Sequence, residues 1–128
     1  MNFLEKYSKY SVLVLRIGLG IAFIAHGWQK FNGIGYVVQF FGTLGFPSFF
    51  AYLAAYGELL GGLAVLFGAF TRYASGLIAA ILIVAIFKVK LSTGFLGGYE
   101  LDFAFLAMSI SLMLSGAGNH SLDKKYKL

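Results

Sequence analysis

The sequence predicts an all-α integral membrane protein: an antiparallel bundle of four transmembrane helices, with an interfacial or re-entrant segment between the first two. Three observations predict this fold. Hydrophobic residues make up 59% of the 128 residues and charged residues only 12%, about half the charged fraction of a soluble domain. Four apolar runs are each close to the ~20 residues that cross the hydrocarbon core of a bilayer. Backbone groups in lipid must pair within their own segment, so each run should be a helix.

The expected spans belong to one membrane domain, residues 1–128. They lie at about residues 10–31, 49–70, 73–91 and 99–117. Only Thr71 and Arg72 separate the second span from the third, so these two helices should form a tight antiparallel hairpin. A short, glycine-rich connection joins the third span to the fourth.

The connection between the first two spans, residues 32–48, is apolar but too short to cross the membrane. It contains four glycines, several aromatic residues and Pro47. We interpret it as an interfacial or re-entrant segment that caps the bundle. A plain amphipathic surface loop is the alternative.

The distribution of basic residues predicts the orientation, because cytoplasmic loops carry an excess of lysine and arginine. The side of the two termini holds Lys6, Lys9, Arg72, Lys124, Lys125 and Lys127, and the other side holds Lys30, Lys88 and Lys90. We therefore expect a multi-pass protein of the plasma membrane with both termini in the cytoplasm. The basic residues form no stripe, so nucleic acid is not an expected partner; the lipid bilayer is.

The chain has no cysteine and only two histidines, His26 and His120. Disulfides, iron–sulfur clusters and thiol redox chemistry are therefore excluded. The two histidines should lie near opposite membrane faces, which argues against a haem held by both. We expect no metal site and no built-in cofactor; any bound cofactor would have to be held by hydrogen bonds and packing.

The first span is apolar but carries Arg16, His26 and Lys30. On a helix these three side chains fall within a wedge of roughly 80°. A charge at the centre of a membrane span costs about 2.5–3.5 kcal/mol, and such residues usually face a bundle interior or a polar cavity. One face of this helix should therefore point inward.

Glu58 lies close to the middle of the second span, among small residues that let neighbouring helices approach. Side chains lean toward the N-terminus of their own helix, so His26 and Glu58 should lean toward each other. We expect a His26/Glu58 pair, with Arg16 either as a second partner of Glu58 or reaching water near Arg72. The structural alternative is a buried pair that only fixes helix packing.

Glu100 and Asp102 open the fourth span, where carboxylates complement the positive end of the helix dipole. Lys30, Lys88 and Lys90 lie on the same side and are their possible partners. Glu100 is also a candidate for ligand binding.

Four fragments stand out in chain order: LRIGLGIAFIAHGWQKFNG at 15–33, GELLGG at 57–62, GAFTRYAS at 68–75 and GAGNHSLD at 116–123. The first resembles an arginine followed by HGxxK. The third resembles a GxxTRxAA turn with Ser75 in place of an alanine, and the last resembles GPGxxSLD with Ala117 in place of a proline. Together they resemble the DoxX family of small four-helix bacterial and archaeal membrane proteins, over nearly the whole chain.

The resemblance implies a link to quinone oxidoreduction, because the family is named for small membrane subunits linked to thiosulfate:quinone oxidoreductase. The family's motif residues carry over to Arg16, His26, Lys30, Glu58, Thr71 and Arg72. The expected function is an oxidoreductase component with an intramembrane polar pocket for a quinone or another small lipophilic molecule.

In that pocket His26 and Glu58 are the candidates for proton transfer, and the candidates for ligand binding are Arg16, Lys30, Arg72 and Glu100. Two alternatives stay open. A midplane acid in a small four-helix protein also fits a proton-coupled transporter. A non-catalytic scaffold for soluble redox enzymes fits the basic tail. A soluble redox enzyme and a second copy of the chain are both possible partners.

Overall fold

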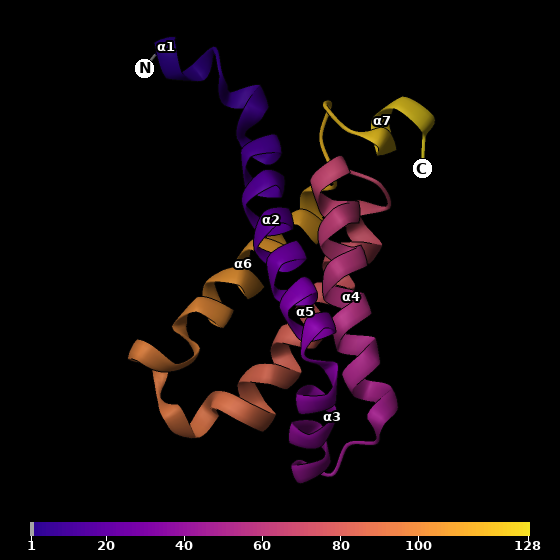
Figure 1. Cartoon of the computed structure of the whole chain (residues 1–128). Coiled ribbons are helices and arrows are strands. Elements are labelled where there is room, and N and C mark those ends of the chain that lie inside the picture. Colours follow the sequence, from indigo (N-terminus) through magenta and orange to yellow (C-terminus); the bar gives the residue numbers. More distant parts are fainter. Residues whose placement is uncertain (1) are drawn as a thin grey trace.

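The computed structural model describes residues 2–128, and within them the secondary structure is entirely helical (Figure 1). The longer helices are α2 (Ser11–Asn32), α3 (Ile34–Thr43), α4 (Ser48–Phe67), α5 (Thr71–Ala85) and α6 (Glu100–Ser115). Short helices lie at the two ends, α1 (Asn2–Glu5) and α7 (Leu122–Tyr126). Four helical segments are long and apolar enough to cross a membrane: Ser8–Asn32, Ser48–Phe67, Thr71–Thr93 and Phe95–Ser115, the last with a kink at Leu96 and Gly97. The predicted four-span helical fold is confirmed.

Both termini lie at one end of the bundle, together with the connection from α4 to α5 (Figure 1). We call this end the terminal side. Helix α3 and the connection from α5 to α6 lie at the opposite end, which we call the far side. Successive spans therefore run in opposite directions.

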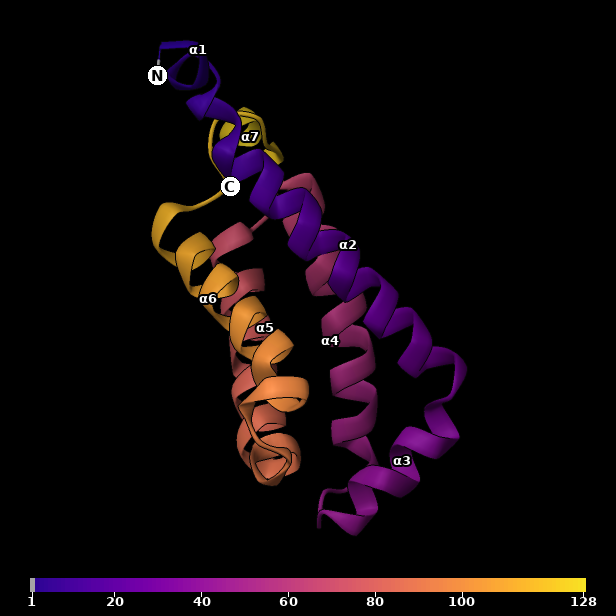
Figure 2. The ribbon, with the colours of Figure 1, turned by 90° about the vertical axis from the view of Figure 1, so that its left-hand side faces the viewer.

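Two helix pairs build the bundle, α2 with α4 and α5 with α6. In Figure 2 the two pairs lie close together on the terminal side and diverge toward the far side. Glycines set the close approach of α2 and α4. A Cβ on Gly20 would lie 2.9 Å from the carbonyl oxygen of Gly62, and a Cβ on Gly27 would overlap the backbone of Leu59. Only glycine permits backbones this close.

The apolar core lies between the two pairs, toward the terminal side. All four spans contribute to it, through Leu19, Phe23, Val65, Ala74, Ile78, Leu82 and Leu112. Each of these residues is at most 9% exposed. The core therefore fills the half of the bundle where the helix pairs converge.

The turn between α4 and α5 lies at residues 68–70, just before the predicted position at Thr71 and Arg72, which instead open α5. Helix α4 ends because Gly68 takes a left-handed conformation at φ 71°, the usual way for a glycine to close a helix. The next residues bend the chain into α5 at once, so the expected tight hairpin is present.

The third span continues past α5. Ile86–Lys90 forms a π-helical turn and Leu91–Thr93 a 3₁₀ turn. Gly94, at φ 81°, then reverses the chain into Phe95–Tyr99 and α6. π-Helical turns within longer helices are frequent at functional sites.

Helix α3 occupies the connection between the first two spans. Its ten residues extend only ~15 Å, half of the ~30 Å hydrocarbon core, so it cannot cross the membrane. None of its residues is buried, and it packs mainly against α4. In Figure 2 it lies beyond the far end of α2 and next to the far end of α4.

Candidate functional site

A cavity of about 580 Å³ opens between the two helix pairs in the far half of the molecule. This volume is in the range of small-molecule sites, ~300–1,000 Å³. Helices α2, α3, α4, α5 and α6 all contribute to its wall. Much of the wall is aromatic, with Phe23, Tyr36, Phe40, Phe41, Phe50 and Phe105. The cavity is therefore an apolar slot that could hold a flat ring.

The first polar feature of the wall is an ion pair between α2 and α4. The Nζ of Lys30 lies 2.9 Å from Oε2 of Glu58 and donates a hydrogen bond of 3.2 Å to Oε1. The Glu58 side chain is 7% exposed and that of Lys30 is 31% exposed. The carboxylate is thus the buried partner of the pair and the lysine the partly exposed one.

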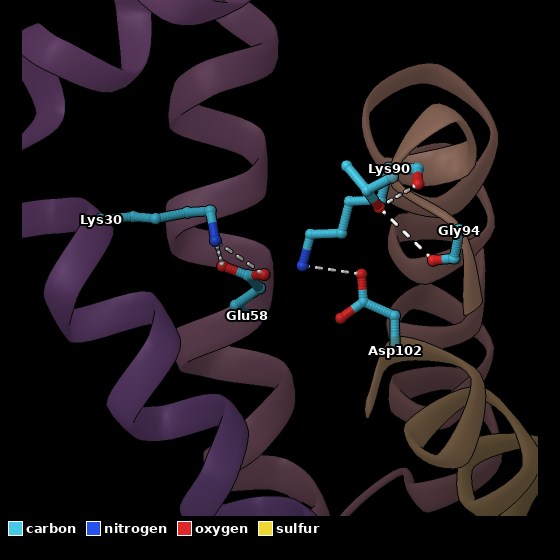
Figure 3. Close-up of polar contacts among 6 residues, drawn as sticks. Lys30, Glu58, Lys90, Gly94 and Asp102 are labelled. Carbon is cyan, nitrogen blue, oxygen red and sulfur yellow. Dashed lines mark hydrogen bonds and ion pairs between the residues drawn. The ribbon is translucent and has the colours of Figure 1, made fainter. Parts of the chain in front are cut away.

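The second polar feature is an ion pair on the opposite wall. Lys90 ends the π-helical turn, and its Nζ lies 3.0 Å from Oδ2 of Asp102 in the first turn of α6. Here too the carboxylate is the buried partner, at 11% exposure against 42% for the lysine side chain. Figure 3 shows the two pairs facing one another from opposite helix pairs.

The cavity therefore matches two carboxylates with two ammonium groups. Burying an unpaired charge is costly, and an ion pair with good geometry offsets part of that cost. Because each carboxylate already has its counterion, the wall favours a neutral ligand that accepts hydrogen bonds over a cation that would need a free carboxylate.

His26 also lines the cavity, but the predicted His26/Glu58 pair is wrong, because Glu58 pairs with Lys30. Lys30 follows His26 by one helical turn on the same face of α2. Its longer side chain leans back toward the helix N-terminus and so reaches Glu58. The His26 ring lies instead near the rings of Phe23 and Phe105, with centroid distances of 5.8 and 6.1 Å.

Arg16 does not reach the cavity. Its side chain is 2% exposed and binds backbone carbonyls on the terminal side. Nε donates to Val65 O at 3.0 Å, Nη2 to Leu66 O at 3.0 Å, and Nη1 to Ala117 O at 2.9 Å and His120 O at 2.8 Å. The prediction that Arg16 pairs with Glu58 or reaches water is therefore wrong. It joins α2 to the end of α4 and to the segment after α6.

The segment after α6 also closes the turn between α4 and α5. The carboxylate of Asp123 accepts hydrogen bonds from the backbone N–H groups of Phe70, the residue before α5, and Thr71, its first residue. The N–H of Asp123 in turn donates to Gly68 O at 2.8 Å. A carboxylate at a helix N-terminus satisfies N–H groups that have no partner in the helix. The GAFTRYAS and GNHSLD stretches thus form one structural junction.

Two further candidates for ligand binding also lie outside the cavity wall. Arg72 is exposed on the terminal side, close to Gly116. Glu100 is exposed and accepts a hydrogen bond from Gly97 N–H at 3.0 Å. Of the six candidate residues from the sequence, the structure brings three together at the cavity: His26, Lys30 and Glu58.

Lys90 and Asp102 belong to the site but were not predicted as site residues. The sequence did place both on the same side of the membrane and named Lys90 as a possible partner of Asp102. An acid in the first turn of a span and a lysine at the end of the preceding one were the signal. What the sequence lacked was the side of the helix to which each side chain points.

A family model for DoxX matches residues 11–91, more than half of the chain. The chain belongs to the DoxX family. The match runs from the start of α2 to the end of the π-helical turn, and so contains Lys30, Glu58 and Lys90. Asp102 and Asp123 of this DoxX protein lie beyond it.

Curated relatives match the DoxX chain over most of their length. "Putative oxidoreductase CatD" of Bacillus subtilis (strain 168) is 44% identical over 120 residues, covering 94% of this chain and 90% of that protein. "Inner membrane protein YqjF" of Escherichia coli (strain K12) is 31% identical, covering 94% and 95%. "Uncharacterized membrane protein Rv3486" of Mycobacterium tuberculosis (strain ATCC 25618 / H37Rv) is 34% identical, covering 90% and 80%. No solved structure matches the chain.

Proposed function

We propose that this DoxX protein is the membrane component of an oxidoreductase system and binds a quinone, or a similar flat lipophilic molecule, in the far-side cavity. One observation carries the proposal: two lysine–carboxylate pairs face each other across an aromatic slot. A quinone needs an apolar slot for its ring, hydrogen-bond donors for two oxygens on opposite edges, and a route for protons. The cavity wall offers all three.

Each group then has a chemical role. Lys30 and Lys90 donate hydrogen bonds to the two quinone oxygens from opposite walls. Glu58 and Asp102 hold the ammonium groups in place and exchange protons with them, as positioned acids and bases do in enzymes. His26 is a further proton donor at the same wall.

These side chains move protons and not electrons. Reduction of a quinone to a quinol takes two electrons and two protons, so the electrons come from a partner. A soluble redox enzyme docked at the membrane is the partner that fits an oxidoreductase component. The name of the Bacillus subtilis relative, a putative oxidoreductase, supports by analogy the oxidoreductase part of the proposal.

The proposed setting is the plasma membrane, with both termini in the cytoplasm. Lysine and arginine are in excess on the terminal side, as is usual for cytoplasmic loops. Lys124, Lys125 and Lys127 are exposed there. They favour contact with anionic lipid headgroups, worth about 1 kcal/mol per basic residue near the surface.

A proton-coupled transporter is the weaker alternative. Transporters of cations use a carboxylate that is free to exchange a proton for the substrate. Both carboxylates of the cavity are instead paired with lysines. A scaffold that binds no ligand would not account for the cavity or for the two ion pairs in its wall.

The test is direct binding. Purified protein in lipid nanodiscs is titrated with a short-chain ubiquinone and a short-chain menaquinone, and the Kd is measured by calorimetry. We expect saturable binding of at least one of them, weakened about tenfold (about 1.4 kcal/mol) by Lys30→Met and by Lys90→Met. Lys88→Met is the matched control, because Lys88 lies in the same π-helical turn but outside the cavity wall.

Two results would contradict the proposal. One is the lack of saturable binding of either quinone to well-folded protein. The other is equal affinity in wild type, Lys30→Met, Lys90→Met, Glu58→Gln and His26→Ala, which would move the ligand to another site.

A further inference from the structure

We propose that the cavity exchanges water and protons with the far side of the membrane only, and is sealed from the terminal side. The sealing is a property of the fold and does not depend on the ligand. Its consequence for quinone chemistry rests on the proposed function. Protons taken up or released by a bound quinone would then cross at the side opposite the termini.

The lysines of the cavity wall belong to the far ends of their spans, and Glu58 lies at the middle of α4. Lys30 lies in the last turn of α2, and Lys90 at the end of the π-helical turn that follows α5. Their side chains are 31% and 42% exposed. Each ammonium is therefore the partly exposed partner of a buried carboxylate (Figure 3). The two helix pairs diverge toward the far side, which is the side of the two lysines (Figure 2).

An apolar layer to which all four spans contribute lies between the cavity and the terminal side. Its members are Leu19 and Phe23 of α2, Val65 of α4, Ile78 and Leu82 of α5, and Leu112 of α6, and each is at most 4% exposed. Phe23 and Leu82 also form part of the cavity wall. The one buried polar side chain of α6 between Phe105 and Leu112 is Ser109, and its hydroxyl donates to Phe105 O of its own helix at 2.8 Å. A single hydroxyl bonded in this way offers no site for a water chain, because a buried water needs two to four polar partners.

The polar groups on the terminal side stop short of this layer. Arg16 is held by four backbone carbonyls. The hydroxyls of Thr71 and Ser75 are buried and have no hydrogen-bond partner within the described residues. They lie one turn apart on α5, and Ile78 follows them toward the cavity. On α5, the buried polar groups of the terminal side thus end at Ser75, and apolar residues follow toward the cavity.

The absence of native cysteine allows a test by cysteine labelling without background. Single cysteines are introduced into the full chain at Ala54 and Ala85, which line the cavity from opposite helix pairs. Asn119→Cys, exposed after α6, reports the terminal side, and Ile78→Cys reports the apolar layer. Proteoliposomes without quinone are treated with a membrane-impermeant, positively charged thiol reagent on one side at a time.

We expect Ala54→Cys and Ala85→Cys to react at least tenfold faster from the side opposite to the one that labels Asn119→Cys. Ile78→Cys should react from neither side until the protein is unfolded. The two cavity variants guard against a loss of folding in either one, which is checked by elution as a monodisperse species.

Two outcomes overturn the inference. Labelling of both cavity cysteines from the Asn119 side at a similar rate would show an open path through the apolar layer. Labelling from neither side, with full labelling after unfolding, would show a closed cavity. Quinone binding is measured separately, so a failure of the sidedness and a failure of the proposed function give different results.

Discussion

The ammonium of Lys30 on α2 lies 2.9 Å from Oε2 of Glu58 on α4, at the point where the two helices come close enough to touch backbone to backbone. One turn before Lys30 on α2, Gly27 faces Leu59, the residue after Glu58. The close approach places the pair at the cavity wall and holds it there. The close packing of α2 against α4 therefore also positions the Lys30–Glu58 pair of the site.

Removal of one partner should cost more than removal of both. Glu58→Gln leaves the Lys30 ammonium without its counterion. Breaking a buried pair typically costs about 3–5 kcal/mol, and we expect about 2–3 kcal/mol here because water reaches the partly exposed lysine. The double variant Lys30→Met/Glu58→Gln should recover most of that loss. Unfolding of the single and double variants in detergent micelles measures the difference; a double variant as unstable as the sum of the singles would contradict it.

A methyl group at Gly27 should separate α2 from α4. The added Cβ would overlap the backbone of Leu59, which cannot move aside as a side chain can. We expect Gly27→Ala to destabilise the fold by about 1–3 kcal/mol and to weaken quinone binding. Gly18→Ala is the control on the same helix, since nothing lies within 4 Å of its added Cβ. Alanine favours a helix by up to about 1 kcal/mol over glycine, so Gly18→Ala should be neutral or stabilising.

The guanidinium group of Arg16 should stabilise the fold, and another positively charged side chain should not replace it. Arg16→Lys keeps the charge but cannot bind four carbonyls, because lysine lacks the planar guanidinium fork. Hydrogen bonds to charged groups are worth about 1.5–3 kcal/mol each. We therefore expect Arg16→Lys to lower the free energy of unfolding, measured in detergent micelles, by about 3 kcal/mol or more. Arg72→Lys is the matched control, because Arg72 is exposed and donates no hydrogen bond within residues 2–128; its stability should change by less than about 0.5 kcal/mol. Equal stability of the two variants would refute the role of Arg16.

The carboxylate of Asp123 should control the start of α5. Asp123→Ala removes the acceptor for two backbone N–H groups, which typically costs about 0.5–2 kcal/mol at a helix N-terminus. Asp123→Asn keeps one acceptor oxygen and should lie between wild type and alanine. Hydrogen exchange of the amides of Phe70 and Thr71 should speed up in Asp123→Ala, while Lys125→Ala leaves it unchanged. An effect of Lys125→Ala as large as that of Asp123→Ala would assign the loss to the tail as a whole.

The sequence correctly indicated that the charged residues of the first and second spans face inward. It could not tell which of them meet. His26 and Lys30 share one face of α2; the sequence favoured His26 as the partner of Glu58 and left Lys30 as a possible partner of Glu100 and Asp102. The length of the lysine side chain and its lean along the helix decided the partner.

The role of Arg16 could not be read from the sequence either. Its acceptors are backbone carbonyls of Val65, Leu66, Ala117 and His120. Every residue carries a carbonyl, so no residue type in the sequence marks an acceptor. Only the ends of α4 and α6, brought next to α2, make these carbonyls available.

The sequence by itself determined that the protein is a four-span helical membrane protein, that its polar side chains gather on inward faces, and that a short apolar segment lies between the first two spans. These features follow from composition and from the cost of exposed backbone in lipid, which act on each segment separately. Only the tertiary structure decided which charges pair, where the cavity opens, and that Arg16 and Asp123 close the terminal side. Those outcomes depend on the rotation and spacing of helices against one another, which glycine contacts between distant parts of the chain set.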